Sequence, residues 1–106
     1  MTHAIDALFE VIEARKDADA GDSYVASLFQ KGTGKISQKL GEEAFEAVIE
    51  AMKGDREALK QESADLLFHL MVLWADQNLK PTDVFEVLES RMGLSGLEEK
   101  KRRTET

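Results

Sequence analysis

Residues 43–65, EAFEAVIEAMKGDREALKQESAD, decide the fold of this chain. At their centre Gly54 can end one helix in the left-handed conformation and Asp55 can cap the next, so the segment predicts a helical hairpin. Two acidic pairs flank this turn at matched distances, the inner pair eight residues and the outer pair eleven residues from Gly54: Glu46 with Glu62, and Glu43 with Asp65. In antiparallel helices the four carboxylates come level, the inner pair about 12 Å from the turn.

Carboxylates in this arrangement indicate a metal site. The two acids on each helix are three residues apart and share a face, and four converging carboxylates repel one another unless a cation keeps them ionised. Oxygen ligands suit Mg²⁺, with Mn²⁺ or Ca²⁺ as alternatives, rather than zinc or copper. A di-iron bundle normally adds Glu-x-x-His, which neither His3 nor His69 completes. We expect Mg²⁺ on four ligands: Glu43, Glu46, Glu62 and Asp65.

Acidic residues on helices usually form a solvated face and not a metal site. From spacing alone, we adopt this interpretation for Glu42, Glu50 and Glu57. Asp65 differs because an apolar run follows it directly, which places its side of the helix near the core. An unpaired carboxylate buried there would be costly, which favours the metal site. His69 lies one turn beyond Asp65 and could touch the site, but we favour a histidine satisfied within the core.

The composition describes one acidic, all-α domain. The chain has 106 residues, a formal net charge of −7, one proline and no cysteine. The charge argues against sequence-independent nucleic-acid binding, and the lack of cysteine excludes disulfides and thiol chemistry. The N-terminus has no basic region followed by an apolar stretch, and the longest apolar run is too short to span a membrane, so we expect a cytoplasmic protein. We expect a domain over residues 1–98 and a charged tail at 99–106.

Helical periodicity predicts an antiparallel bundle. The stretch from Leu66 to Trp74 is apolar on nearly every face and should be buried all round. A single short bundle would leave part of this surface in water, so the sequence predicts a homodimer that covers it. Residues 31–35 contain two glycines in three positions, and we expect a loop there. The expected helices cover about residues 5–16, 23–30, 36–53, 56–77 and 81–92.

Lysines precede the first acidic pair. Lys35 and Lys39 lie two turns and one turn before Glu43 on the same helix stripe, and Lys31 and Lys35 flank the two glycines. Backbone amides at the start of the acidic helix are a favourable place for phosphate. The segment is not a Walker A loop, and on its own it is equally an ordinary loop with solvated lysines. Together with a metal site on the following helix, it predicts a polyphosphate substrate.

The acid pattern resembles that of the all-α nucleotide pyrophosphohydrolases, the MazG-like superfamily. Further stretches resemble one member, the phosphoribosyl-ATP pyrophosphohydrolase family of histidine biosynthesis, over roughly residues 4 to 100. The acids alone would not select this family, and the first two of the following stretches discriminate it from the others. The matching stretches are SYVASLF at 23–29, KGTGKI at 31–36, QKLGEE at 38–43 and ADLLFHL at 64–70.

This resemblance implies a reaction. Phosphoribosyl-ATP and water would give phosphoribosyl-AMP and pyrophosphate, with cleavage between the α- and β-phosphates. The family is typically homodimeric, and the cyclohydrolase domain that some members carry is not expected here. Carried over to this sequence, the four acids named above would bind Mg²⁺. One of them, such as Glu43 or Glu46, or the adjacent Glu42, would orient or deprotonate the attacking water.

The resemblance also suggests how phosphate oxygens are held. Lys35 and Lys39, with Lys31 near them, would contact the phosphates. Arg91, with Lys100 and Arg102, could do so near the glycine-containing loop at 93–96, from the same subunit or from its partner. A charged C-terminal tail is the commoner meaning of these last residues.

Three alternatives remain open from the sequence. A house-cleaning enzyme of the same superfamily would hydrolyse other nucleoside triphosphates with the same acids. A non-catalytic helical dimer would use the acids for solubility only, and Mg²⁺ would then not raise its melting temperature. A phosphate-binding regulatory module would bind the substrate but release no product.

Overall fold

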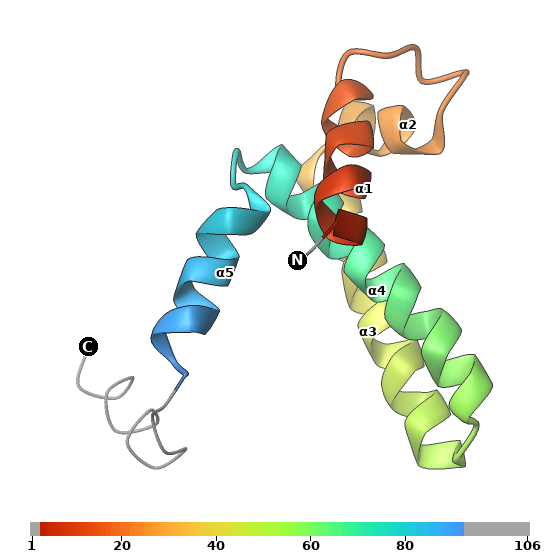
Figure 1. The fold of residues 1–106 in the computed structure, drawn as a ribbon. Coiled ribbons are helices and arrows are strands. Elements are labelled where there is room, and N and C mark those ends of the chain that lie inside the picture. Colours follow the sequence, from red (N-terminus) through yellow and green to blue (C-terminus); the bar gives the residue numbers. More distant parts are fainter. Residues whose placement is uncertain (1–2, 93–106) are drawn as a thin grey trace.

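The computed structural model describes residues 3–92, and helices account for all the regular structure in that range. No strand occurs among these residues, so the all-α prediction is confirmed for them. Figure 1 shows two long antiparallel helices with a pair of shorter helices packed at one end and a last helix leading away. The helices are α1 His3–Ala14, α2 Tyr24–Lys31, α3 Thr33–Lys53, α4 Arg56–Asp76 and α5 Pro81–Ser90.

The hairpin of α3 and α4 forms as the sequence predicts. Gly54 adopts the left-handed conformation, with φ of 76°, and its N–H bonds the carbonyls of the last turn of α3. Asp55 caps α4, since its carboxylate accepts a hydrogen bond of 3.0 Å from the backbone N–H of Ala58. The two helices therefore run back along each other from this turn, which is the requirement for bringing the acidic pairs together.

The expected loop at residues 31–35 is wrong. Only Gly32, with φ of 95°, separates α2 from α3, and Gly34 and Lys35 already lie in the first turn of α3. The side chain of Thr33 supplies the physical reason: its hydroxyl donates a hydrogen bond of 2.6 Å to the carboxylate of Asp76 at the end of α4. This bond closes the open end of the hairpin and offsets the weak helix propensity of Gly34.

The hydrophobic core lies at the end of the hairpin away from its turn, where α1 and α2 cover α3 and α4 (Figure 1). The half of the hairpin nearest the turn has little cover, and even Leu67, just beyond the middle of α4, is 47% exposed. The expectation that residues 66–74 are buried all round is therefore wrong for this chain by itself, because too few helices pack around them. The core consists of Phe9, Ile12, Leu28, Ile36, Met71, Val72 and Ala75.

The last helix begins at the only proline of the chain. Pro81 is buried in the first turn, and the carboxylate of Asp83 accepts a hydrogen bond from the backbone N–H of Lys80. From this start α5 packs on α1 and then leads away from the hairpin (Figure 1). The expected charged tail at 99–106 lies outside the described residues. No helix in the described part of the chain is long and apolar enough to cross a membrane.

Candidate active site

Acids from both helices of the hairpin meet between them. Glu43 of α3 and Glu62 and Asp65 of α4 each place a carboxylate oxygen within 4.8 Å of the others. Glu46, one turn further along α3, faces Glu62 and shares a hydrogen bond with it. The hairpin thus brings three of the four predicted acids within reach of one ion, and Glu46 adjoins them through Glu62, which lies between the two acids of α3.

Two oxygens in this cluster are buried and have no hydrogen-bond partner: Oε2 of Glu43 and Oε2 of Glu62. A buried carboxylate oxygen without a partner is costly, and a cation is the ligand that removes this cost. Asp65, which we had expected near the core, is instead exposed. Hard oxygen donors from three side chains, with room on the exposed side for water or phosphate, fit Mg²⁺ or Mn²⁺.

The electrostatics of the cluster also favour a cation. The pKa of Glu46 is raised, first by its hydrogen bond with Glu62 and then by the negative charge of that residue. The pKa of Glu62 is raised as well, first by its hydrogen bond with Glu43 and then by burial. The neighbouring acids therefore make Glu46 and Glu62 harder to ionise, and a bound dication would favour their ionised forms.

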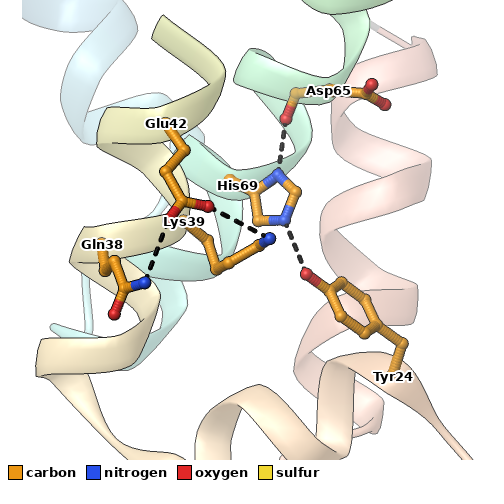
Figure 2. A network of polar contacts seen from close by, with 6 residues as sticks. All are labelled: Tyr24, Gln38, Lys39, Glu42, Asp65 and His69. Atoms are coloured by element: carbon orange, nitrogen blue, oxygen red, sulfur yellow. Dashed lines mark hydrogen bonds and ion pairs between the residues drawn. The ribbon is translucent and has the colours of Figure 1, made fainter. Parts of the chain in front are cut away.

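Glu42 points to a different group of residues from the cluster. Its carboxylate accepts a hydrogen bond of 2.9 Å from Gln38 and pairs with the ammonium group of Lys39 at 3.3 Å (Figure 2). Both contacts lower the pKa of Glu42, Gln38 first, while the bond to Glu42 raises the pKa of Lys39. Glu42 is thus held ionised beside Lys39, and Lys39 is held cationic beside the acid cluster.

Three predicted site residues remain, and only one of them lies on the hairpin. Lys35 is one turn before Lys39 on α3, and its charge contributes to the lowered pKa of Glu42. Lys31 is the last residue of α2, and Arg91 follows α5, so this chain places neither of them on the hairpin. Glu57, which we interpreted as solvated, pairs with Lys60 on the exposed surface.

One residue beside the site, Tyr24, was not assigned from the sequence. His69 is buried, as we favoured, and its ring nitrogens contact the backbone carbonyl of Asp65 and the hydroxyl of Tyr24 (Figure 2). Tyr24 opens α2, 45 residues before His69, so helical spacing gave no sign of the contact. Its place in the SYVASLF stretch was the only available signal, and it gave no role.

A helical hairpin with clustered acids and an adjacent lysine is the arrangement of the all-α nucleotide pyrophosphohydrolase class. The family model of phosphoribosyl-ATP pyrophosphohydrolase matches residues 5–92, which is most of the chain. The chain belongs to this family.

Curated relatives agree with this assignment. A phosphoribosyl-ATP pyrophosphatase of Azospirillum brasilense is 57% identical over 99 residues, which cover 93% of this chain and 89% of the relative. Proteins of the same name from Parvibaculum lavamentivorans and Rhizorhabdus wittichii are each 56% identical. The first comparison covers 95% of this chain and 93% of the relative, and the second 94% of both.

Proposed function

We propose that this chain hydrolyses phosphoribosyl-ATP to phosphoribosyl-AMP and pyrophosphate, the second step of histidine biosynthesis, with Mg²⁺ held by Glu43, Glu62 and Asp65 and with Glu46 beside them. The pair of buried, unpartnered oxygens on Glu43 and Glu62 carries the metal assignment. Family membership over residues 5–92 and the names of the relatives support the reaction. Mn²⁺ has similar ligand preferences and is expected to substitute.

The acids would act as ligands and as a base. Glu43, Glu62 and Asp65 lie close enough to share one ion, and Glu46 adjoins them through Glu62. A bound Mg²⁺ supplies charge neutralisation and alignment for the phosphates. Glu46 is exposed and lies outside the three acids that could share one ion. We therefore assign it the task of orienting and deprotonating the attacking water.

Lys39 is the best-placed phosphate ligand. It lies one turn before Glu43 on the same stripe of α3, and its ammonium group is held cationic by Glu42. An ammonium group at the edge of an acid cluster can bind phosphate oxygens that also face the metal. We assign Glu42 the role of holding Lys39, because its own carboxylate is occupied by Gln38 and Lys39. Lys35 extends the same basic stripe, and Lys31 and Arg91 are more distant candidates.

We also propose a homodimer. On α3 four large apolar side chains recur at helical spacing and are exposed, Phe45 at 67% and Met52 at 83% among them. An apolar stripe of this kind on a soluble helix marks a contact with another chain. A second copy related by a two-fold axis would cover the stripe with the same stripe of its own hairpin. The stripe consists of Phe45, Val48, Ile49 and Met52.

The test of the reaction is pyrophosphate release from phosphoribosyl-ATP by the purified chain, in Mg²⁺ and in EDTA. We expect release in Mg²⁺ only, with phosphoribosyl-AMP as the second product. Plain nucleoside triphosphates, assayed side by side, should be turned over much more slowly. Faster turnover of those triphosphates would instead identify a house-cleaning enzyme, and binding of substrate without release would identify a regulatory module.

A further inference from the structure

Lys35 differs from the other lysines of the hairpin because it has no acidic partner. Each of the others pairs with a glutamate three residues away on its own helix, at 3.0 to 3.5 Å: Lys39, Lys53 and Lys60. Lys35 is half-buried, yet its ammonium group makes no ion pair or hydrogen bond with any residue that the structure describes. A half-buried positive charge without a counter-charge favours an anionic ligand.

The neighbours of Lys35 on α3 explain why it is unpaired. Three residues further along is Gln38, whose amide donates to Glu42, and four residues further along is Lys39. Like charges four residues apart on a helix repel each other. The charge of Lys39 is offset by Glu42 at 3.3 Å, whereas nothing of this kind offsets the charge of Lys35. A bound anion would remove this cost.

The first turn of α3, which carries Lys35, is held in place from α4. Gly32 gives this helix no side-chain cap, but the hydroxyl of Thr33 donates a hydrogen bond of 2.6 Å to Asp76. Asp76 lies in the last turn of α4, where the helix dipole disfavours an acid, and meets the start of α3, where the dipole favours one. Thr33 and Lys35 are about 200° apart around α3, so Lys35 extends on a different side from Asp76.

The position of Lys35 along α3 suits the chemistry of the substrate. Lys35, Lys39 and Glu43 follow one stripe at intervals of four residues, so Lys39 lies about 6 Å and Lys35 about 12 Å from Glu43 along the helix axis. Phosphoribosyl-ATP has a triphosphate at one end and a single 5-phosphate at the other, on the ribose attached to adenine. The adenine and two riboses separate these groups, so the cations that bind them must be spaced apart as well.

We propose that Lys35 binds the 5-phosphate of the ribosyl group on adenine, while Lys39 and the metal bind the triphosphate. This inference rests on the proposed function and deepens it, because it names the residue that separates phosphoribosyl-ATP from plain nucleoside triphosphates. A plain triphosphate has no second phosphate and leaves Lys35 unpaired. A contact between two ionised groups corresponds to a difference of about 10- to 100-fold in affinity, which is the selectivity that Lys35 supplies.

Steady-state hydrolysis of phosphoribosyl-ATP and of ATP in Mg²⁺ tests this selectivity. In Lys35→Gln we expect KM for phosphoribosyl-ATP to rise about 10- to 100-fold with kcat nearly unchanged, because the lost contact acts in the ground state and the transition state alike. The kcat/KM for ATP should stay the same, whereas Lys39→Gln should lower it for both substrates. Lys60→Gln removes the same charge from the exposed surface of α4 and is the control. Equal losses for both substrates in Lys35→Gln, or no loss for either, would overturn the proposal.

Calorimetric titration with phosphoribosyl-AMP and with AMP tests the same contact without hydrolysis. Only the first ligand carries the second phosphate, so Lys35→Gln should weaken its binding about 10- to 100-fold and leave the binding of AMP unchanged. Lys35→Arg keeps the charge and should keep most of the affinity for phosphoribosyl-AMP. Equal weakening of both ligands in Lys35→Gln would overturn the inference. Failure of the wild type to cleave phosphoribosyl-ATP would instead contradict the proposed function, and the titrations would still test Lys35.

Discussion

At the scale of single residues, the carboxylates of the acid cluster repel one another. Three carboxylates have oxygens within 4.8 Å of one another, and both Glu46 and Glu62 have raised pKa values because of their acidic neighbours. Such a site is expected to stabilise the fold poorly on its own and to favour a bound dication for the same reason. Stability and activity should therefore respond in opposite directions when one charge is removed.

Glu62→Gln keeps the shape of the side chain and removes its charge. We expect kcat/KM to fall at least about 100-fold, because an ion ligand is lost, while the melting temperature in EDTA stays the same or rises. Differential scanning fluorimetry with and without Mg²⁺ should also show a smaller Mg²⁺-induced rise than in the wild type. Glu10→Gln, an exposed acid on α1, is the control and should change neither quantity. A full Mg²⁺-induced rise in Glu62→Gln would remove Glu62 from the ligand set.

The raised pKa values also predict how stability depends on pH. Between the usual carboxyl pKa of 4.5 and the raised values, the folded chain binds more protons through Glu46 and Glu62 than the unfolded chain does. The contribution of these two acids to the free energy of unfolding in EDTA should therefore decrease as the pH rises through that window. Glu42, whose pKa is lowered, acts in the opposite sense and loses its contribution as the pH falls below its usual value.

Urea unfolding in EDTA at a series of pH values from 4.5 towards neutral measures this effect. Comparison of the wild type with Glu62→Gln isolates the cluster, since the contribution of Glu42 is common to both proteins. We expect the wild type to lose more stability than the variant across the window, and saturating Mg²⁺ to abolish the difference in slope by binding the ionised form. Parallel curves in EDTA would mean that the cluster does not retain protons.

At the scale of elements, the turn of the hairpin sets the register between the acid pairs. Gly54 adopts φ of 76°, which side chains other than that of glycine rarely tolerate, and Asp55 caps the following helix. At the other end the bond from Thr33 to Asp76 joins the two helices again. The two helices are therefore joined at both ends of the hairpin, by the turn and by the Thr33–Asp76 hydrogen bond. The acid cluster lies between these two points.

Two glycine substitutions on the same hairpin should have opposite effects. Gly54→Ala forces a side chain into the left-handed region and should lower the free energy of unfolding by about 1 kcal/mol. Gly41 lies within α3 with open space around its Cα, so Gly41→Ala should raise stability by up to about 1 kcal/mol. Chemical denaturation of both variants measures the two changes. Destabilisation of both by the same amount would refute the account of the turn.

At the scale of the whole molecule, the hairpin extends well beyond the helices that pack against it. The described part of the chain measures 48 Å along its longest axis, and the core occupies only one end of it. Near the turn the apolar stripe of α3 is exposed, and Leu67, just beyond the middle of α4, is exposed as well. The homodimer was expected from residues 66–74, but more of the exposed large apolar side chains lie on α3 than in that stretch.

Val48→Asp places a charge in the middle of this stripe. We expect the variant to be a monomer by size-exclusion chromatography with light scattering, at concentrations where the wild type is a dimer, because a charge buried at an interface is not compensated. Val11→Asp alters a valine on α1 that is 48% exposed, against 57% for Val48, and should leave the dimer intact. If the two variants have the same mass as the wild type, the stripe is not the interface.

Much of the fold and most of the acid cluster could be predicted from the sequence because the signals involved are local. A glycine and an aspartate define the turn between α3 and α4, and the spacing of acids along two helices defines which of them meet. The proposed metal class follows from the donor atoms alone. The loop prediction at residues 31–35 failed because a distant partner, Asp76, stabilises the helix start at Thr33.

Tertiary structure alone decided the rest. It placed the unpartnered oxygens on Glu43 and Glu62 instead of Asp65, paired Glu42 with Lys39 instead of with the cluster, and brought Tyr24 to His69 across 45 residues. Helical periodicity determines which residues share a face, but the packing of one helix against another determines what that face meets. The sequence by itself therefore determined the hairpin and its acids, whereas the contacts that orient them depend on how α2 and α3 pack against α4.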